Sequence, residues 1–530
     1  MGITDFDGDN RPDIVVTNNG SYLGFLRSYT NTPPTITSFT PTNGAVGTSV
    51  TITGTNFNTT AANNKVFFGA TQATVTAATA TSLTVTVPTG ATYQPITVTN
   101  SDNSHTASSI KPFLVTFNGG GNSVVFKTPV SFTTTGQANG TAIGDLDGDG
   151  KSDLVVILST SNTVSIYRNT SSTGTITASS FTKITDIVNM GTYDVKIADI
   201  DGDGKMDIIT SNYYNTTNKV TVLRNQTTSY GAATPGTISF ATGVSSPTLT
   251  SSGTQWGKII VEDMDGDGKL DIITSSRNTA NTFISIIKNT STVSGNILTP
   301  TLSVVYTYTT GSYTDGIAVA DLDGDGLKDI AVVNNVTTGT NPNSVVVLRN
   351  TTVYPYISFA TGVAFTTGTQ PRAIAIGDID NDSKPDLVVT NFGSNTISLF
   401  RNTATSGTIT TASFAAKVDF TTQSQPYDVA LADINGDGKL DINIVNQGNA
   451  SYLSVFKNTA TDNTAFSAST LATRYDKTLS SSTSAQCMAV GDLDGNGKND
   501  VVAGINNAFY VFRGADPNFT ITSFTPTTAN

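Results

Sequence analysis

The segment GDLDGDGKSD places carboxylates at alternating positions of a glycine-rich turn. Asp145, Asp147 and Asp149 occupy positions one, three and five of this motif, and Asp153 occupies position nine. Lys151, at position seven, can contribute only its backbone carbonyl oxygen. Hard oxygen ligands at this spacing suit Ca²⁺, which accepts about six to eight oxygens at roughly 2.3–2.6 Å. The motif therefore predicts a calcium-binding loop.

The same motif occurs in several copies along the chain. Its first aspartates are Asp5, Asp145, Asp199, Asp263, Asp321, Asp378, Asp433 and Asp492. From the second copy onward, neighbouring copies lie 54 to 64 residues apart. One copy alone could be an aspartate-rich surface turn, but this many copies with one spacing argue against that interpretation. An EF-hand is not indicated, because it requires flanking helices and a glutamate late in the loop.

Departures from the motif predict weaker sites. Glycine at position six supplies the positive φ angle of a tight loop. Asn10 and Ser383 replace this glycine in the first and sixth copies, and asparagine tolerates that conformation better than serine does. Asn435 and Asn496 replace aspartates at positions three and five of the last two copies. These amides lower the negative charge of the loop, and with it the expected affinity.

The acidity of the chain is concentrated in these loops. The sequence has 40 acidic and 28 basic residues, and Glu262 is its one glutamate, which we expect to be an exposed neighbour of a loop. A nucleic-acid-binding protein would carry a basic stripe instead, and no apolar run approaches the ~18 residues of a membrane span.

Cys487 is the one cysteine, which excludes an intramolecular disulfide, and its apolar surroundings predict burial. The first residues lack a signal peptide and already lie inside a repeat unit, so we expect the natural start upstream.

Each copy lies in the same series of short β-branched runs. An alternating run such as AIAIGD precedes the motif, runs such as DLVVT and TISLFRN follow it, and a phenylalanine-containing run ends the unit. Four short strands per unit at a regular period predict a β-propeller. Seven units fit between residues 117 and 515. We expect the run from Val124 to Phe132 to supply the outer strand of the last unit, Cys487 to Arg513, and to close the ring.

The segment between the first copy and the ring has a different pattern. Its strings VTITGTNF, VFFG, LTVTVP and ITVTN resemble the TIG/IPT immunoglobulin-like family over residues 34–116. The resemblance implies a β-sandwich that acts as a spacer or interaction domain. The predicted fold is thus all-β, a seven-bladed β-propeller with calcium loops plus an immunoglobulin-like β-sandwich. His105, the one histidine, is expected to be a solvated loop residue.

A short repeat at a long distance suggests an array. The string ITSFTPT begins at Ile36 and again at Ile521, and comparable strand ends precede both copies. Residues 1–33 then form a partial propeller blade at the end of a preceding repeat, and residues 516–530 begin a next TIG/IPT domain. The opposing interpretation is a coincidence between two generic sandwich starts. We favour one full period of a longer array.

The aspartate motif and its strands resemble the FG-GAP/VCBS repeats of integrin α-subunit propellers and of many bacterial surface proteins. In that family the loop lies between the innermost strand and the next one and binds Ca²⁺. The resemblance implies up to eight sites, with ligands taken in each copy from positions one, three, five, seven (by its carbonyl) and nine. The predicted ligands in the first four copies are Asp5, Asp7, Asp9, Arg11, Asp13; Asp145, Asp147, Asp149, Lys151, Asp153; Asp199, Asp201, Asp203, Lys205, Asp207; and Asp263, Asp265, Asp267, Lys269, Asp271. Those in the last four are Asp321, Asp323, Asp325, Leu327, Asp329; Asp378, Asp380, Asp382, Lys384, Asp386; Asp433, Asn435, Asp437, Lys439, Asp441; and Asp492, Asp494, Asn496, Lys498, Asp500.

The first functional hypothesis is an extracellular or cell-surface protein, of bacterial type, that serves as an adhesin or as part of a surface fibre. Weak calcium sites of this kind stay filled outside the cell and largely empty in cytosol. The expected partners are neighbouring copies or adjacent repeats, and surface glycans or matrix proteins. No nucleic acid and no membrane span in this segment are expected.

The second hypothesis is a carbohydrate-binding lectin. Residues just before each inner strand would ring the mouth of the channel opposite the calcium loops: Tyr193, Trp256, Asp315, Arg372, Tyr427 and Gln486. The third hypothesis, an enzyme, is disfavoured, because the propeller has no histidine for a nucleophile–base pair. A paired-carboxylate hydrolase could recruit Asp194, Asp315 or Asp428, but the sequence places no two of them at catalytic separation.

Overall fold

The structure is a computed structural model of the chain. It describes residues 2–4, 13–17, 23–26, 32–117, 121, 123–188, 190–212, 220–228, 230–231, 237–245, 256–277, 283–291, 297, 299–302, 304–311, 313–336, 341–448, 450–480 and 485–515. In these residues the regular structure is all β-strand, apart from two short 3-10 turns, η1 (Ala61–Asn63) and η2 (Thr299–Leu302). None of the described residues forms a helix long and apolar enough to cross a membrane.

The first described strands form a sheet of their own. Strands β1 (Gly2–Thr4), β2 (Asp13–Thr17) and β3 (Leu23–Leu26) pair in antiparallel order β1-β2-β3. This order matches the inner three strands of a propeller blade. The loop of the first aspartate motif, residues 5–12, lies outside the described residues, as does the segment 516–530 that was predicted to begin another sandwich.

The next unit is a two-sheet sandwich. One sheet has the order β4-β6-β10-β9 and the other β12-β11-β7-β8, while β13 pairs in parallel with β5. The strands are β4 (Thr35–Thr40), β5 (Asn43–Gly44), β6 (Ser49–Thr55), β7 (Asn64–Phe68), β8 (Thr71–Ala73), β9 (Val75–Ala78), β10 (Ser82–Thr86), β11 (Pro95–Asn100), β12 (His105–Pro112) and β13 (Leu114–Val115). Alternate residues such as Val50, Ile52, Leu83 and Val85 point between the sheets and form their shared core. The immunoglobulin-like sandwich predicted from the sequence is present.

The remaining described strands form seven four-stranded antiparallel sheets. The inner strands are β15 (Ala138–Gly144), β19 (Thr192–Ala198), β23 (Trp256–Glu262), β27 (Thr314–Ala320), β31 (Pro371–Gly377), β35 (Pro426–Ala432) and β39 (Cys487–Gly491). The second strands are β16 (Asp153–Leu158), β20 (Asp207–Asn212), β24 (Asp271–Ser276), β28 (Asp329–Asn334), β32 (Asp386–Asn391), β36 (Asp441–Asn446) and β40 (Asp500–Ile505). The third strands are β17 (Thr163–Asn169), β21 (Val220–Leu223), β25 (Phe283–Lys288), β29 (Ser344–Leu348), β33 (Thr396–Phe400), β37 (Ser451–Phe456) and β41 (Ala508–Phe512). The outer strands are β18 (Phe181–Val188), β22 (Val244–Ser245), β26 (Val304–Thr309), β30 (Val363–Thr366), β34 (Val418–Thr421), β38 (Tyr475–Ser480) and β14 (Val130–Thr133).

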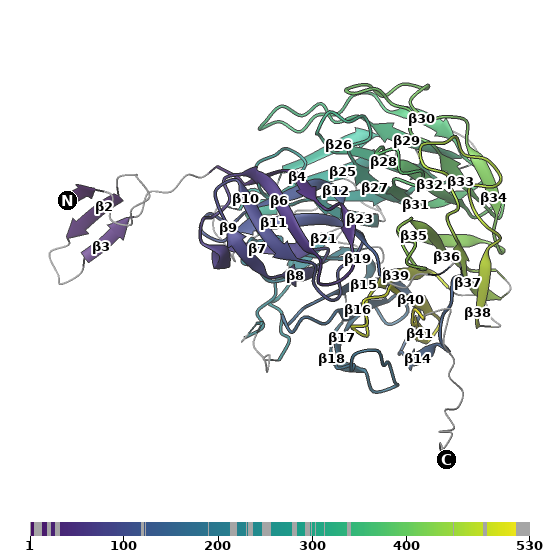
Figure 1. The fold of residues 1–530 in the computed structure, drawn as a ribbon, viewed down its shortest axis with the longest axis horizontal. Helices are drawn as coiled ribbons and strands as arrows, with labels where there is room; N and C mark the ends of the chain where they lie inside the picture. The colour runs from purple at the N-terminus through teal and green to yellow at the C-terminus, as the bar shows by residue number, and fades with distance from the viewer. Residues whose placement is uncertain are drawn as a thin grey trace, which may run out of the picture.

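These sheets are the blades of a closed propeller. Each inner strand contacts the inner strand of the next sheet, and β39 contacts β15, so the inner strands surround a common centre (Figure 1). The last blade is completed by β14, which pairs with β41 in the order β14-β41-β40-β39. The predicted closure by a strand from the beginning of the ring is therefore confirmed. It removes the open edge that the last blade would otherwise expose.

The middle strands of each blade are buried on both faces, because neighbouring blades cover them. Every residue of β16 is buried. Its Leu154 and Val156 pack with Val502 of the last blade, whereas Val155 packs with Val195 of the next blade. Outer strands such as β18 are mostly half-buried or exposed instead, with only Phe181 buried. The continuous β-branched runs of the sequence thus correspond to strands between two blades.

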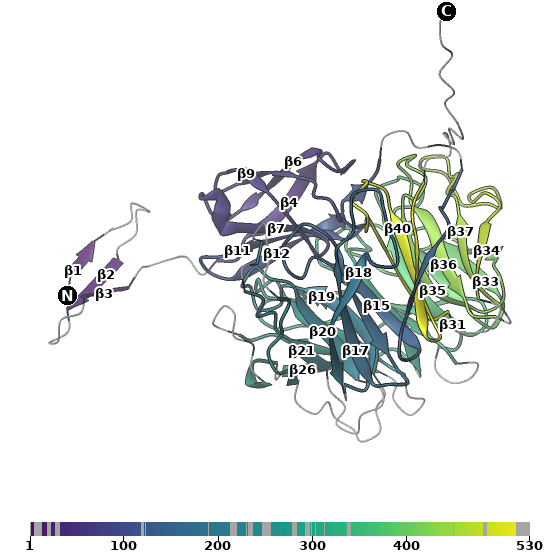
Figure 2. The ribbon, with the colours of Figure 1, turned by 90° about the horizontal axis from the view of Figure 1, so that it is seen from below.

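The sandwich lies against the propeller. Figure 2 shows its strands on one side of the ring, above the ends of the blades. Phe67 of β7 does not face the sandwich core but packs with Leu146 and Met206 of the propeller. The face that receives the sandwich carries the aspartate loops, because Asp145 N donates a hydrogen bond to the carbonyl oxygen of Ala70 at 3.0 Å.

The closure of the ring depends on aromatic packing, which gives a test of the fold. The rings of Phe132 (β14) and Phe509 (β41) stack with centroids 4.9 Å apart, and Phe181 meets Phe132 edge-on at 5.3 Å. We expect Phe132→Ala to lower the free energy of unfolding by about 3–5 kcal/mol in urea titrations, because a buried aromatic is removed. Val188→Ala is the control, since Val188 is 59% exposed. Equal stability of the two variants would contradict the closure by β14.

Candidate metal centres

Each described aspartate loop connects the inner strand of a blade to its second strand. The loop of the first complete blade runs from Asp145, directly after β15, to Asp153, the first residue of β16. This is the position expected from the FG-GAP/VCBS resemblance. Because the blades repeat around one axis, the seven described loops lie on the same face of the ring.

The aspartates at positions one and nine are held by backbone amides. Asp145 Oδ1 accepts hydrogen bonds from Gly148 N at 2.7 Å and Asp149 N at 3.1 Å, and its Oδ2 accepts from Gly150 N at 2.8 Å. Asp153 accepts from Leu146 N at 2.9 Å and from Asn169 N at 2.8 Å. These bonds fold the loop around its own carboxylates.

The carboxylates converge closely enough to share one cation. In five loops three aspartates each offer an oxygen within 4.8 Å of the other two: Asp145, Asp147 and Asp153; Asp199, Asp201 and Asp203; Asp263, Asp265 and Asp271; Asp321, Asp323 and Asp325; and Asp378, Asp380 and Asp386. Oxygens on a sphere of about 2.4 Å radius, as around Ca²⁺, lie no farther apart than about 4.8 Å. Asp380 Oδ1 is buried and has no hydrogen-bond partner. The donor set of these loops therefore fits a hard divalent cation.

The conformation at position six agrees with the prediction from the sequence. The glycines there have φ angles between +80° and +90°, and Ser383 has a φ of +73°. Position four has a positive φ as well, for example +76° at Gly148 and +54° at Asn381. The sequence analysis recognised the requirement at position six and missed the one at position four.

The sequence analysis also missed a basic side chain in each loop. The residue near the end of the third strand points back to the carboxylates at positions three and five. Arg349 pairs with Asp323 and Asp325, at 2.6 Å each, and Arg401 Nη2 lies 2.8 Å from Asp382. The corresponding residues of the other blades are Arg168, Arg224, Lys288, Lys457 and Arg513. The recurrent RN and KN pairs in strings such as VVVLRN were the available signal.

The asparagine of the same pairs joins neighbouring blades. Asn402 N donates to Asp386 Oδ1 of its own loop at 2.8 Å, while its side-chain Nδ2 donates to the carbonyl oxygen of Leu322 in the preceding loop at 2.8 Å. Equivalent bonds to the preceding loop are made by Asn169, Asn225, Asn289, Asn350 and Asn458. Each loop is therefore connected to the next one around the ring.

Burial makes the loops unfavourable places for uncompensated charge. It is the main cause that raises the pKa of Asp329 to about 7 and the pKa of Asp386 and Asp441 to about 8. The pKa of Asp145 and of Asp263 is raised to about 7 by burial, with neighbouring aspartates adding to the effect. A divalent cation would supply the positive charge that these carboxylates need in order to remain ionised.

Four of the residues proposed for the opposite mouth form one packed cluster: Tyr193, Asp315, Arg372 and Tyr427. Tyr193 and Tyr427 are 4% and 8% exposed and Asp315 is 1% exposed. The Arg372 guanidinium lies over the Tyr427 ring at 3.8 Å and 3.6 Å from Asp315, and Arg277, which the sequence analysis missed, lies over Tyr193 at 4.5 Å. Trp256 begins β23, and Gln486 is half-buried before β39 with its N–H bonded to the carbonyl of Gly504. The described aromatic rings of this cluster do not present open faces to solvent.

Two acidic candidates meet inside the ring. Lys258 Nζ lies 3.4 Å from Asp194 and 3.8 Å from Asp428. Burial lowers the pKa of Lys258, but the two carboxylates raise it, and the net direction is upward. Asp315 is separate from this pair and binds Arg277 at 3.1 Å. The Lys258 ammonium group thus compensates the negative charge of Asp194 and Asp428, the two carboxylates that a hydrolase would need.

Two expectations about single residues were wrong, and one was correct. Glu262 is 7% exposed rather than exposed, because it forms an ion pair with Lys328 of the next blade at 2.7 Å. His105 is 5% exposed rather than solvated, since the sandwich packs it against the loop at Gly268, and burial lowers its pKa. Cys487 is buried as expected, and burial raises its pKa to about 12.

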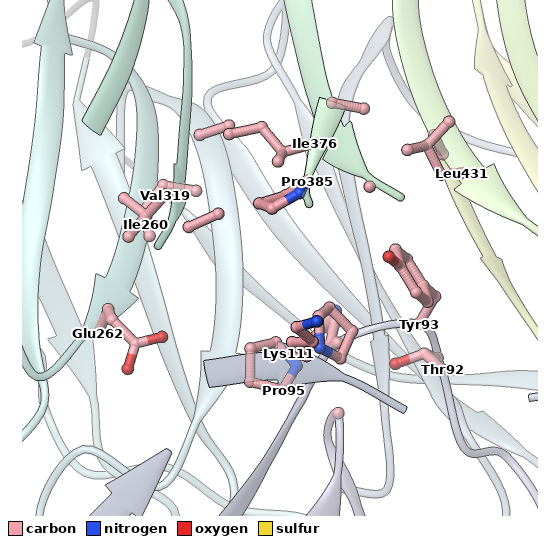
Figure 3. A pocket seen from close by; sticks show the side chains of 18 of the residues that line it. Thr92, Tyr93, Pro95, Lys111, Ile260, Glu262, Val319, Ile376, Pro385 and Leu431 are labelled. Carbon is pink, nitrogen blue, oxygen red and sulfur yellow. The ribbon is translucent and has the colours of Figure 1, made fainter. Parts of the chain in front are cut away.

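A cavity of about 1090 Å³ lies between the sandwich and the inner strands. Figure 3 shows Tyr93 and Lys111 of the sandwich on one side and Ile260, Val319 and Ile376 of the inner strands on the other. Asp194, Lys258 and Asp428 line it as well. The central channel is therefore covered by the sandwich on the loop face.

Comparison with known families agrees with this architecture. The model of the FG-GAP-like repeat matches residues 145–210, 263–332, 321–389 and 378–444, and the model of the IPT/TIG domain matches residues 34–117. The chain thus contains FG-GAP-like repeats and an IPT/TIG domain, which fit an extracellular repeat protein of adhesion type and are typically non-catalytic. A comparison with curated proteins gave no match.

Several solved structures are similar at low identity. The structure of BBS1N in complex with ARL6DN, soaked with lead, is 10% identical, covers 73% of this chain and 95% of its own, and has a TM-score of 0.44. An auxiliary nutrient binding protein from Bacteroides thetaiotaomicron is 12% identical, with 91% and 98% covered and a TM-score of 0.33. A putative phosphatase from the same organism is 14% identical, with 91% and 97% covered and a TM-score of 0.37. At these scores the matches do not bear on function.

The raised pKa values predict an unusual pH dependence for the chelated protein. An aspartate whose pKa is raised on folding contributes stability at low pH that is lost as the pH rises through its folded-state pKa. With EDTA present, the melting temperature should therefore fall between about pH 4, near the pKa of aspartate in the unfolded chain, and about pH 8, near the raised pKa of Asp386 and Asp441 in the folded protein. Calcium at saturation should remove this fall. A melting temperature of the chelated protein that is constant or rises over this range would contradict the prediction.

Proposed function

We propose that this chain is a calcium-stabilised extracellular repeat protein, used as an adhesin or as a structural part of a surface fibre built of alternating propeller and Ig-like modules. The observation that carries the proposal is the ring of buried carboxylate clusters, at least five of which hold three converging aspartates. Such a cluster favours folding only when a cation neutralises it, so metal binding contributes directly to stability.

Calcium fits the loops better than magnesium does. The carboxylates and the backbone carbonyl at position seven would supply a flexible set of oxygen ligands, whereas Mg²⁺ requires near-ideal octahedral geometry and keeps several waters. The calcium sites of extracellular modules have dissociation constants on the order of 10⁻⁴–10⁻³ M. Affinities in this range favour a location outside the cell, on a bacterial surface, where calcium is abundant.

The modular arrangement supports a role as an extended adhesive protein. The partial blade β1–β3 precedes a complete sandwich and propeller, so the chain is organised as consecutive modules. Repetition of modules extends a fibre and multiplies weak contacts. The proposed partners are neighbouring copies or adjacent repeats, with surface glycans or matrix proteins as the attached surface.

The carbohydrate-binding alternative receives no support from the predicted mouth. Sugar stacking requires an open aromatic face, and Tyr193 and Tyr427 are covered by the guanidinium groups of Arg277 and Arg372. Catalysis is not part of the proposal, because the acidic pair Asp194 and Asp428 is bridged by Lys258.

Calcium should stabilise the protein in proportion to the number of intact loops. At a calcium concentration ten times the dissociation constant, each site should contribute about 1.4 kcal/mol to the free energy of unfolding. The Asp380→Asn variant should lose roughly 1.4 kcal/mol of this calcium-dependent stability. Asn435 stands at the same position of another loop, which indicates that a chain with this substitution folds. Asp419→Asn is the matched control, because Asp419 lies on the outer strand β34. Melting curves that EDTA and calcium leave unchanged would overturn the calcium assignment.

The fibre role predicts a visible assembly. Negative-stain images of full-length material isolated from its native source should show beaded filaments, with a propeller-sized bead at regular intervals, since tandem modules share one chain. Isolated discs with no filaments would contradict the array and would favour a free binding protein. Images of the same preparation after addition of EDTA show whether the filaments depend on calcium.

A further inference from the structure

The sandwich contacts the metal loops themselves through hydrogen bonds. Thr99 Oγ1 donates to Asp199 Oδ2, a position-one carboxylate, at 3.3 Å. Thr106 N donates to the carbonyl oxygen of Gly268 at 2.6 Å, and Lys111 Nζ donates to that of Ser383 at 2.6 Å. Gly268 and Ser383 both stand at position six of their loops. Three loops are thus bonded to the sandwich at residues that shape the metal site.

Two further loops are packed against the sandwich. The loop that begins at Asp145 bonds through its first amide to Ala70, and its Leu146 shares a core with Phe67. In the last loop, a Cβ placed on Gly495 would lie 3.4 Å from Thr89 Cγ2. The five contacted loops begin at Asp145, Asp199, Asp263, Asp378 and Asp492, and we call them the docked loops.

The loop that begins at Asp321 differs from the docked loops. Among the described residues, no hydrogen bond joins it to the sandwich, and a Cβ placed on Gly324 or Gly326 would meet no atom within 4 Å. Its Arg349 and Asn350 make the same kind of contacts within the propeller as the corresponding residues of the docked loops, so this loop serves as the internal control. The loop that begins at Asp433 belongs to neither set, because its Leu440 packs in a cluster with Tyr93 and Leu114 of the sandwich.

The docked loops contact the sandwich closely in the closed shape that the structure shows. A Cβ on Gly202 would lie 2.5 Å from the carbonyl oxygen of Ser104, so the loop backbone approaches the sandwich closely. Without a cation, Asp199, Asp201 and Asp203 offer oxygens within 4.8 Å of one another, and their like charges repel. A loop that opens to relieve this repulsion would displace the surface on which Thr99 and Ser104 rest.

We propose that the docked loops are a metal-dependent interaction surface for the sandwich, so that cation binding fixes the sandwich rigidly on the propeller and cation loss releases it. The proposal rests on the metal binding of the proposed function and adds its mechanical consequence. Two sites that share one conformational element are coupled in both directions. The docked sandwich therefore also increases the cation affinity of the docked loops, and not that of the loop that begins at Asp321.

The test measures the docking of the sandwich directly in the full chain. Donor and acceptor dyes are placed on cysteines introduced at Thr79 of the sandwich and Val353 of the propeller, both exposed, while Cys487 is 1% exposed and resists labelling. Single-molecule energy transfer should give one narrow population in calcium and a broad, shifted one in EDTA. Circular dichroism at the same temperature checks that the blades remain folded.

Matched variants separate docking from general stability. Asp201→Asn weakens a docked loop and should raise the calcium concentration for half-maximal docking by about threefold, because a ligand charge is lost. Asp323→Asn makes the same change in a loop outside the docked set and should leave this midpoint unchanged. Thr99→Val, which removes the bond to Asp199, should broaden the transfer distribution in calcium.

The outcomes distinguish this inference from the proposed function. If calcium raises the melting temperature but leaves energy transfer unchanged, the docking proposal is overturned and the calcium sites stand. If Asp201→Asn and Asp323→Asn shift the midpoint equally, docking follows general stability and the proposal is again overturned. If calcium changes neither the melting temperature nor the transfer, the metal assignment itself fails.

Discussion

The structure depends on a carboxylate that is fully removed from water at the start of each second strand. Asp153, Asp207, Asp271, Asp329, Asp386, Asp441 and Asp500 are all 0% exposed. Each accepts one hydrogen bond from the second residue of its loop and one from the end of the third strand, as Asp386 does from Ile379 N and Asn402 N. A buried charge is stable only when such bonds and a nearby cation compensate for the lost hydration. The position-nine aspartate therefore fixes the shape of the loop, and in its ionised form it requires compensating positive charge.

From this carboxylate the contacts extend around the ring. The asparagine that donates its N–H to the aspartate also donates its side-chain amide to the preceding loop. The last blade has Gly514 at this place, and Asn499 bonds to Asp433 instead. Asparagine side chains thus link each loop to the loop of the neighbouring blade, including the first and last blades, where the ring closes. The basic residue beside the asparagine holds the carboxylates at positions three and five and provides part of the positive charge.

Much of this arrangement followed from local sequence patterns. Alternation, β-branched runs and the aspartate spacing predicted the strands, the loop position, the positive φ at position six and the closing strand Val124 to Phe132. Properties that depend on how distant segments meet were not predictable in this way. Glu262 and His105 were expected in solvent, because nothing in the neighbouring sequence reveals Lys328 or the covering sandwich. Tyr193, Asp315, Arg372 and Tyr427 of the predicted mouth lie together, but the sequence does not show that Arg277 and Arg372 cover the tyrosine rings.

The placement of the sandwich decides how a load on the chain is distributed over the propeller. If the sandwich met the outer edge of a blade, a pull on the chain would load one sheet and its ladder of hydrogen bonds. Instead it rests on several loops of one face, so a load is distributed over blades whose loops are already joined by asparagines. Each contact is weak, since it consists of a few hydrogen bonds of about 1 kcal/mol and small packed surfaces. On the proposed docking mechanism, their number and their dependence on closed loops make cation occupancy, rather than any single contact, the property that governs the stiffness of the module pair.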